Sequence, residues 1–583
     1  MTMTRTALLM LAVAAAPWPS AAQDVNIQQQ QQRFQPPGPA RDQPTAKTGT
    51  AGIRGRVFAA DTGRPLRRAK ITVSAQELGP DGRTTSTNPD GRYEIKDLPA
   101  GRYNIAVARS GYLQLRYGQR RPLEQGKPLQ LLDKQLMDNV DFSLPRMSLI
   151  TGRVYDEANE PISGVSVMAL RSMFFEGKRK LVMAGPMVNT DDAGQYRMLG
   201  LSPGTYFVMA SMRDTWTVTD NGVETTMGYS PTYFPGTASS SDASRITVGI
   251  GQEAVNIDLT LIPGRAANIS GTALDSHRQP LQGRTISLGQ EFRGPQSMMM
   301  FSNSGAPVGA DGSFTIKNVP PGEYKLSISA TTTGRTATPT TIPETAAATI
   351  AVAGVDIDNV SLITSAGWSL SGQLVAENGG APGIPRERLS IAGRSMQPDM
   401  QPRTGVGSGP DNGRVKDDWT FTIGGLFGPM LIRPNLPDGW VVKAILQNDR
   451  DITDTPIEMK SGEEFTGVQV VVSNRPTIVT GQLQDDKGNG ITDGTVIVFP
   501  TDTEKWMENS RFVRSARPDQ QGQYQIKGLP PGDYFAVAVD YVQEGMWNDP
   551  EYLESLRRYG QKLTLAEAAS QPTTLKIVKP DGS

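Results

Sequence analysis

The sequence predicts an all-β protein, built as a tandem array of about five antiparallel β-sandwich modules. A unit of turn, strand, turn and strand recurs along the chain, and an apolar-x-Gly-x-apolar segment precedes each copy. The chain has 61 Gly and 43 Pro among 583 residues, which suits a fold with many turns. Successive repeats begin about 100 residues apart, which is the size of one β-sandwich and longer than a solenoid repeat.

The clearest copy of the recurring unit runs from Asp519 to Tyr534. Gly522 accepts the positive φ of a tight turn, and the residues after it alternate between polar and apolar, as in a strand with one buried face. Pro531-Gly532 forms a second turn. Tyr534 then begins a strand that is apolar on both sides, which indicates a central strand. We expect the Tyr534 ring to be buried and its hydroxyl to meet a nearby backbone group.

Opening and closing strands predict the boundaries of five modules. The opening strands are Ile53–Val57, Ile150–Val154, Ile269–Ala273, Leu370–Leu374 and Val479–Leu483. The closing strands are Val140–Leu144, Val255–Leu261, Val355–Leu362, Phe465–Val472 and Thr574–Val578. We therefore expect β-sandwich modules 1 to 5 at residues 51–147, 148–264, 265–365, 366–474 and 475–583. Module 4 is degenerate, because its copy of the recurring unit, after Asp418, lacks the final Pro-Gly-x-Tyr.

The modules differ between the recurring unit and the closing strand. Module 2 has a long loop there, from Trp216 to about Ser244, and module 3 has a Thr-, Ala- and Pro-rich run, Ala330–Ala348, that we expect to be mobile. In module 5 the segment Asn548–Tyr559 predicts a helix. Asp549 can cap it, Pro550 fits its first position, and its leucines share one face. We expect this helix to cover a sheet edge or end.

The first 50 residues predict export. Residues 1–22 have the pattern of a signal peptide, with Arg5 before the apolar run Ala7–Ala16 and small residues before Gln23. Residues 23–50 form a Gln/Pro-rich linker that we expect to be disordered. No Cys follows the leader to carry a lipid anchor, and no later run approaches the ~20 apolar residues of a membrane helix. We expect a periplasmic or extracellular protein with no membrane span after signal cleavage.

Charge and residue types exclude several classes of function. The formal net charge is −1, so no global field attracts nucleic acid or an anionic membrane. The absence of Cys excludes disulfides, thiol chemistry and Cys-based zinc sites. No Gly-rich phosphate loop of the nucleotide-binding type appears. The short basic runs Arg67-Arg68, Lys178–Lys180 and Arg557-Arg558 are interpreted as solvated faces.

The repeats resemble a known family. The Gly-x-Val opening, the D-G-x-[YF]-x-I-x-x-[LV]-P-P-G-x-Y core and the closing strand together are similar to carboxypeptidase regulatory-like domains, over nearly all of residues 51–583. The resemblance implies a transthyretin-like (Ig-like) β-sandwich, also called the carbohydrate-binding-like fold. It implies a non-catalytic module used as a spacer, an adhesive unit or the partner of an attached domain. Three phrases, starting at Asp451, Ser515 and Trp547, resemble multi-domain proteins of this type that acidobacteria export.

The sequence offers no catalytic constellation, so we expect no enzyme, no cofactor and no metal site. His277 is the single histidine and lies in a polar turn, where a solvated turn residue is the favoured interpretation. The Asp pairs at 191–192, 417–418 and 485–486 are adjacent residues, which point to opposite faces of a strand. We interpret them as turn-forming residues. A weak Ca²⁺ site at a module junction is the alternative.

Aromatic residues in the variable segments of modules 1 and 2 are the candidate ligand-binding residues. They are Tyr112, Tyr117, Trp216, Tyr229, Tyr233 and Phe234. Aromatic rings on the rim of a sandwich can stack on sugar rings, while flanking polar groups bind hydroxyls. The favoured alternative is that these rings anchor long loops to the sandwich surface.

These patterns favour an exported, non-catalytic structural or interaction protein of the cell envelope, a rod of modules in series. The alternative is a carbohydrate-binding protein that uses the aromatic residues of modules 1 and 2. The expected partners are accordingly a polysaccharide or another envelope protein.

Overall fold

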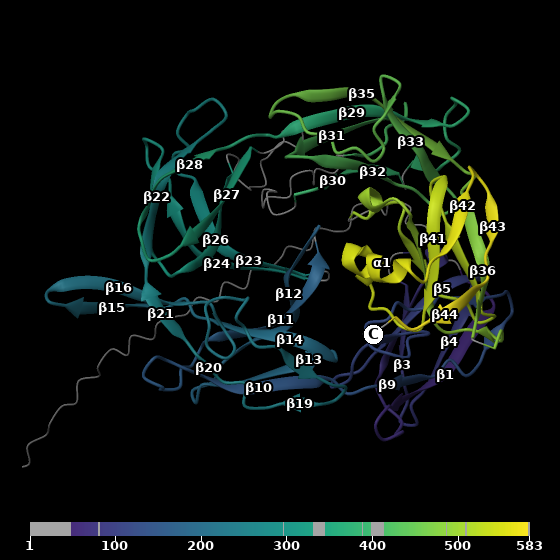
Figure 1. Cartoon of the computed structure of the whole chain (residues 1–583), viewed down its shortest axis with the longest axis horizontal. Helices are drawn as coiled ribbons and strands as arrows, with labels where there is room; N and C mark the ends of the chain where they lie inside the picture. The colour runs from purple at the N-terminus through teal and green to yellow at the C-terminus, as the bar shows by residue number, and fades with distance from the viewer. Residues whose placement is uncertain are drawn as a thin grey trace, which may run out of the picture. The chain divides into compact units, whose positions relative to one another are not determined.

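The structure is a computed structural model, and it describes residues 48–79, 82–175, 177–294, 297–329, 344–386, 389–397, 413–485, 487–507 and 510–580 (Figure 1). The predicted signal peptide, nearly all of the predicted linker, residues 330–343 of the predicted mobile run and Asp486 lie outside these residues. All described residues belong to one compact unit of the chain, Lys47–Ser583.

Module 1 has two sheets. In the first sheet, β1 pairs with β4, β8 and β9. The second sheet has the order β3-β2-β5-β6, and β7 also pairs with β5. The elements are β1 (Ala51–Ala59), β2 (Lys70–Ser74), the 3₁₀ turn η1 (Gln76–Leu78), β3 (Arg83–Ser86), β4 (Arg92–Leu98), β5 (Gly101–Ala108), β6 (Leu115–Arg116), β7 (Leu129–Leu131), β8 (Leu136–Met137) and β9 (Phe142–Leu144).

Module 2 repeats this arrangement and adds a third sheet. The first sheet has the order β13-β10-β19, and β20 also pairs with β10. The second has the order β12-β11-β14-β17, and β18 also pairs with β14. The third has the order β15-β16-β21. The strands are β10 (Ser148–Tyr155), β11 (Ser166–Phe175), β12 (Lys178–Asn189), β13 (Gln195–Leu201), β14 (Gly204–Ser211), β15 (Thr215–Asp220), β16 (Val223–Ser230), β17 (Thr232–Tyr233), β18 (Ile246–Val248), β19 (Glu253–Ala254), β20 (Leu259–Thr260) and β21 (Ile262–Arg265).

Modules 3 and 4 show the regular pattern and its degenerate form. Module 3 has the sheets β25-β22-β28 and β24-β23-β26-β27, whereas module 4 has β31-β29-β35-β33-β34 and only β30-β32. The strands of module 3 are β22 (Ala267–Leu274), β23 (Thr285–Gly294), β24 (Ser297–Pro307), β25 (Ser313–Val319), β26 (Gly322–Ser329), β27 (Thr345–Val352) and β28 (Ile357–Ile363). Those of module 4 are β29 (Trp368–Ala376), β30 (Ser390–Ser395), β31 (Thr420–Leu426), β32 (Met430–Asn435), β33 (Val441–Gln447), β34 (Arg450–Asp451) and β35 (Glu464–Ser473).

In module 5 the two sheets are joined into one, because β44 pairs with both β36 and β41. The path is β37-β36-β44-β41-β38-β39, with β40 and β43 on β36 and β42 on β41. The elements are β36 (Ile478–Gln484), β37 (Gly490–Ile491), β38 (Thr495–Pro500), η4 (Thr503–Lys505), β39 (Arg514–Ala516), β40 (Gln523–Lys527), β41 (Gly532–Val539), η5 (Met546–Asn548), α1 (Pro550–Arg557), β42 (Gln561–Leu565), β43 (Ser570–Pro572) and β44 (Leu575–Val578).

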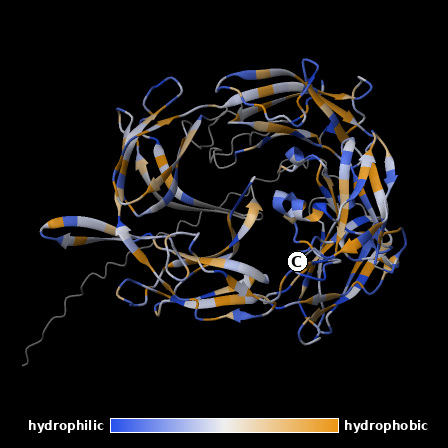
Figure 2. Cartoon of the chain, viewed as in Figure 1, coloured by the Kyte–Doolittle hydropathy of each residue, from blue (hydrophilic) through white to orange (hydrophobic). Residues whose placement is uncertain are grey.

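Each module buries a hydrophobic core of its own. In module 1, for example, Ile53 of β1 and Ile71 of β2 belong to one buried cluster, so the two sheets pack face to face. Separate clusters fill modules 2, 3, 4 and 5. Figure 2 shows hydrophobic and hydrophilic residues interspersed along the strands, as the period-two pattern predicts. The predicted fold, a tandem array of β-sandwiches, is confirmed.

The glycine of every opening strand allows the closing segment to approach closely. A Cβ at Gly55 would overlap the backbone carbonyl of Val140, and a Cβ at Gly481 would overlap that of Thr573. The other three modules repeat this, at Gly152, Gly271 and Gly372. In three modules a tyrosine hydroxyl donates to the same carbonyl: Tyr93 to Val140 at 2.7 Å, Tyr196 to Ile257 at 2.6 Å, and Tyr524 to Thr573. This explains the fixed Gly in the apolar-x-Gly-x-apolar pattern.

The Pro-Gly turn of the recurring unit carries the chain from one half of the sandwich to the other. The strand before the turn pairs with the opening strand, as β4 does with β1, and the strand after it pairs elsewhere, as β5 does with β2. The tyrosine after the turn is buried in all four regular modules. Its hydroxyl donates to the carbonyl four residues earlier: Tyr103 to Pro99, Tyr206 to Ser202, Tyr324 to Pro320 and Tyr534 to Pro530. The prediction for Tyr534 is confirmed.

One recurring pairing departs from the antiparallel pattern, and in module 5 the pairing of β41 with β44 is also parallel. The opening strand of each module runs parallel to its closing segment: β1 to β8 and β9, β10 to β19 and β20, β22 to β28, β29 to β35, and β36 to β43 and β44. The five predicted closing strands correspond to β9, β20, β28, β35 and β44. Each module therefore begins and ends on two neighbouring strands.

The predicted helix of module 5 is present as α1 (Figure 1). Asp549 caps it by accepting a hydrogen bond from the Glu551 backbone N–H at 3.0 Å, and Pro550 is its first residue. Leu553 and Leu556 are fully buried in a second cluster with side chains of β38 and β41. The helix thus covers the outer face of the sheet, and the expectation that it covers an edge or end is wrong.

The long loop predicted in module 2 is largely a hairpin. β15 and β16 pair around Asn221-Gly222, whose φ values are 50° and 80°. Positive φ at both central residues is the geometry that Asn-Gly favours in a two-residue hairpin turn. The strand β21 joins β16 to complete the third sheet. The prediction of a loop overlooked this Asn-Gly signal.

Candidate functional sites

The two candidate aromatic residues of module 1 pack against its core. Tyr112 is half-buried, and the Arg146 guanidinium lies 5.4 Å from the centroid of its ring. Arg146 in turn pairs with Asp61, Nε to Oδ2, at 2.5 Å. Tyr117 is also half-buried against the core, and burial raises the pKa of its hydroxyl. Both rings therefore pack against the module while each keeps an accessible part.

Trp216 and Tyr229 meet across the β15–β16 hairpin of module 2. Their ring centroids are 4.7 Å apart and their planes are tilted by 42°. The Tyr229 hydroxyl donates to Oε2 of Glu157 at 2.9 Å. Burial, followed by this carboxylate, raises the pKa of Tyr229. Both rings are half-buried, so each keeps an accessible part.

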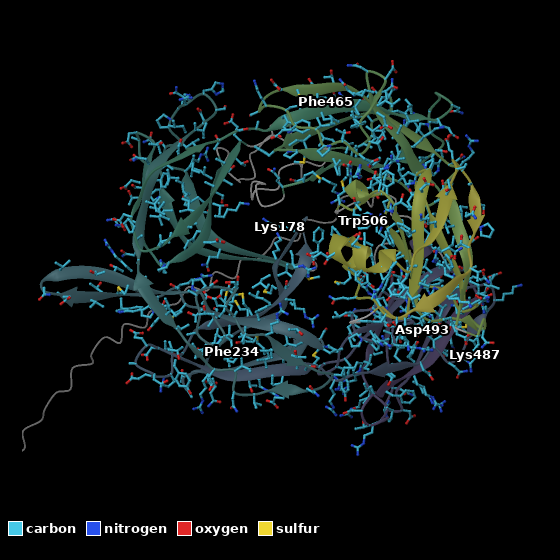
Figure 3. All side chains as sticks on the ribbon, in the orientation of Figure 1. Lys178, Phe234, Phe465, Lys487, Asp493 and Trp506 are labelled. Atoms are coloured by element: carbon cyan, nitrogen blue, oxygen red, sulfur yellow. The ribbon has the colours of Figure 1, made fainter. Side chains whose placement is uncertain are left out.

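Tyr233 and Phe234 are neighbours in sequence but pack against different clusters. Tyr233, at the end of β17, contacts the Met-rich cluster on the outer face of β11 and β14. Phe234, which is labelled in Figure 3, contacts the sandwich core. Successive residues of an extended segment point to opposite faces, which explains the division. The structure therefore brings together Trp216 and Tyr229, and it does not assemble the six aromatic residues into one surface.

The polar candidates lie in turns. His277 is exposed, and its backbone N–H donates to Oδ1 of Asp275 at 2.8 Å. Asp191, Asp418 and Asp485 each accept backbone N–H bonds two residues ahead, as the turn interpretation predicts. Within the described residues no group of three or more His, Cys, Asp or Glu side chains is placed to hold a metal ion.

A buried arginine joins modules 1 and 5. Arg517 is 2% exposed and pairs with Glu124 of module 1 at 3.3 Å and with Asp493 of module 5 at 2.5 Å. Its Nη1 also donates to the backbone carbonyls of Gly118 and Gln125, at 2.9 and 2.8 Å. We call these groups the Arg517 cluster; Asp493 is labelled in Figure 3.

Further contacts surround the Arg517 cluster. Glu124 accepts backbone N–H bonds from Arg120 and Arg121, which fixes the carboxylate toward Arg517. Arg120 pairs with Asp493 at 2.9 Å, and the Glu544 backbone N–H donates to the carbonyl of Leu123 at 2.8 Å. The first and last modules of the array are therefore in direct contact.

Arg179 makes a similar link between modules 2 and 5. Its Nη2 lies 2.5 Å from Oδ2 of Asp549 and 2.8 Å from Oε2 of Glu551, at the start of α1. Asp549 is 2% exposed, so this carboxylate serves both the helix cap and the ion pair. The interpretation of Lys178–Lys180 as a purely solvated face is wrong for Arg179. No local pattern marks Arg179 or Arg517 as a link between modules, because the partners Asp549 and Glu124 are hundreds of residues away.

The family assignment follows from the repeats. The model of the carboxypeptidase regulatory-like domain matches residues 52–136, 149–261 and 268–353, which lie in modules 1, 2 and 3. Modules 1, 2 and 3 are tandem carboxypeptidase regulatory-like domains. The glycine contact and the buried tyrosine that these three domains share recur in module 5, beyond the matched residues.

The other comparisons are more distant. No curated protein matches the chain. Among solved structures, the Streptococcal ancillary pilin is 11% identical, covering 54% of this chain and 98% of that chain with a TM-score of 0.18. A minor pilin of Streptococcus agalactiae is 11% identical, covering 36% of this chain and 97% of that chain with a TM-score of 0.20. The shaft pilin SpaA of Lactobacillus rhamnosus GG is 13% identical, covering 37% of this chain and 98% of that chain with a TM-score of 0.19. Scores this low do not bear on function.

Among the residues that the structure describes, no helix is long and apolar enough to cross a membrane. The one α-helix in this described part, α1, has eight residues.

Proposed function

We propose that the chain is an exported, non-catalytic structural and interaction protein of the cell envelope. The observation that carries the proposal is the Arg517 cluster, in which buried charge holds modules 1 and 5 together. Ion pairs this deeply buried cost desolvation, and they fix a specific arrangement of the groups they join. A protein whose buried charges join its domains is suited to hold surfaces in position for a partner.

Export is supported by the signal-peptide pattern of residues 1–22. Fractionation of the source bacterium, with mass spectrometry of the mature N-terminus, tests it. The expected result is a chain that starts near Gln23 in the periplasm or the medium. A full-length chain in the cytoplasm would contradict the proposal.

A deletion strain tests the structural role. We expect it to be more sensitive to detergent than the parent strain, and we expect wild-type protein to restore resistance. The Arg517→Ala protein should restore less. Arg557→Ala should restore fully, because the ion pair of Arg557 with Glu554 is exposed. Full resistance of the deletion strain would count against a structural role in the envelope.

The second candidate function is carbohydrate binding through Tyr112, Tyr117, Trp216, Tyr229, Tyr233 and Phe234. The half-buried Trp216–Tyr229 pair favours it, because aromatic rings on a sheet can stack on sugar rings. Binding of the mature chain to a panel of bacterial and plant polysaccharides tests it. Saturable binding that Trp216→Ala abolishes and Tyr155→Phe leaves unchanged is the expected result. Binding that survives in Trp216→Ala would place the site elsewhere.

A further inference from the structure

A basic cavity of about 520 Å³ lies where module 4 meets module 5. Its wall includes Arg433 of β32, Arg511, Arg514 of β39 and Lys527 of β40. Trp440, which is half-buried, supplies an apolar part of the wall. We call it the arginine cavity. Its volume falls in the range of ~300–1,000 Å³ that is usual for small-molecule sites.

Two of the arginines share one carboxylate. Nη2 of Arg433 lies 3.2 Å from Oδ1 of Asp454, and Nη2 of Arg511 lies 2.8 Å from Oδ2 of the same residue. The Arg433 and Arg511 side chains are 17% and 16% exposed. One carboxylate compensates one guanidinium, so this trio keeps a positive charge in a largely buried place.

Arg514 adds a second uncompensated charge. Its Nη1 donates to the backbone carbonyls of Ser510 and Val513, at 3.0 and 2.9 Å. No carboxylate among the described residues lies within ion-pair distance of Arg514. Burial lowers the pKa of this guanidinium, and the nearby Arg433 and Arg511 act in the same direction. The exposed Lys527 extends the positive surface outward.

Arg433 retains unused hydrogen-bonding capacity. Its Nη1 donates to the carbonyls of Ile432 and Thr453, whereas its Nε is buried with no hydrogen-bond partner. Buried polar groups in native proteins are nearly always satisfied, and an orphaned one calls for an explanation such as an absent ion or ligand. Excess charge and an orphaned donor thus coincide beside one cavity.

We propose that the arginine cavity binds an oxyanion, a carboxylate or phosphate group of a small ligand. Planar guanidinium groups bind such anions through two parallel hydrogen bonds, and several arginines around a cavity supply the charge that the anion neutralises. Trp440 contacts the uncharged part of the ligand. This site is independent of the structural role proposed above and of the aromatic residues of modules 1 and 2.

Calorimetric titration of the full chain tests the proposal at constant ionic strength. The probes are sodium phosphate, sodium galacturonate and, as a neutral control, galactose. We expect saturable binding of at least one anion and none of galactose. Binding of phosphate alone identifies a phosphate ligand, and binding of galacturonate alone identifies a carboxylate on a sugar. Absence of saturable binding for both anions overturns the proposal, as does equal binding of galactose.

Variants locate the binding. Arg514→Gln should weaken it by about tenfold or more, because a charge-assisted pair is lost. Lys527→Ala should weaken it by a smaller factor. Lys562→Ala, which removes an equally exposed charge from β42, should leave it unchanged. If circular dichroism shows that Arg514→Gln does not fold, the affinity of Lys527→Ala tests whether the anion binds in the arginine cavity. Wild-type affinity in every folded variant of the cavity overturns the assignment.

Discussion

Nη1 of Arg517 lies 3.3 Å from Oε2 of Glu124, and the two side chains are 2% and 6% exposed although 393 residues separate them. Each belongs to a module with its own core, so neither module needs the pair in order to fold. The ion pair instead specifies which surface of module 1 meets module 5.

Replacing Arg517 by Ala should open the contact between modules 1 and 5. Removing one partner of a buried ion pair leaves the other charge uncompensated, which costs ~3–5 kcal/mol. Hydrogen exchange of the segment 118–125 should therefore accelerate by roughly a hundredfold or more. Arg557→Ala is the matched control, since its ion pair is exposed. Unchanged protection of this segment in Arg517→Ala would show that the pair does not hold the contact.

Gly372→Ala should destabilise module 4. A Cβ at this position would overlap the carbonyl of Val468, so β35 would have to shift, which costs about 1–3 kcal/mol or more. Gly383 lies in the same module with open space around it and no positive φ, so Gly383→Ala should be close to neutral. Chemical denaturation followed by tryptophan fluorescence measures both. Equal effects of the two substitutions would refute the close-approach explanation.

Tyr103→Phe should alter stability at alkaline pH. Burial, followed by the Glu77 carboxylate, raises the pKa of Tyr103 to about 12 from a usual 10. The unfolded chain therefore loses this proton first, and the stability that the tyrosine contributes is present below pH 10 and lost as the pH rises toward 12. The Tyr103→Phe substitution removes this contribution to the dependence of stability on pH. It also costs ~1 kcal/mol at neutral pH, because the hydrogen bond to Pro99 is lost.

Urea denaturation at pH 8 and pH 11 measures the effect of Tyr103→Phe. Tyr155→Phe is the control, because Tyr155 is only half-buried. The difference between the two pH values should shrink in Tyr103→Phe and stay as in wild type in Tyr155→Phe. A wild-type difference in Tyr103→Phe would contradict the prediction.

Glu377→Gln should reduce the sensitivity of the protein to acid. Hydrogen bonding to Arg475 lowers the pKa of Glu377 to about 2, with Lys443 contributing in the same direction. A carboxylate with a depressed pKa contributes stability above its usual pKa, which is lost as the pH falls toward 2. The drop in Tm between pH 5 and pH 2.5 should be smaller in Glu377→Gln than in wild type.

Glu458→Gln is the control for this prediction, since Glu458 is exposed and forms no ion pair within the described residues. Its acid-induced drop in Tm should equal that of wild type. If Glu377→Gln also matches wild type, the pairs with Arg475 and Lys443 do not contribute to stability.

The sequence alone predicts the local structure well where a residue's role depends on its neighbours in the chain. Tyr534 follows its Pro-Gly turn and bonds four residues back, and α1 begins at the expected cap, Asp549. The hairpin at Asn221-Gly222 is equally local, because its turn type follows from these two residues. Period and turn chemistry suffice for features of this kind.

The links between modules could not be predicted in this way. Arg179 and Arg517 look like ordinary surface charges, because their partners come from distant modules. The arginine cavity has the same origin: Arg433 and Arg511 are far apart in sequence and meet only through Asp454. Such sites depend on how domains pack, which no periodicity encodes.

The parallel pairing of opening and closing strands governs how a module responds to tension. A pull on the two ends of module 4 would draw β29 and β35 past each other along their length. The hydrogen bonds between parallel strands are evenly spaced, so they would share the load instead of breaking one after another. Each module must therefore shear a whole strand pair before it can lengthen, which makes the array resistant to mechanical extension.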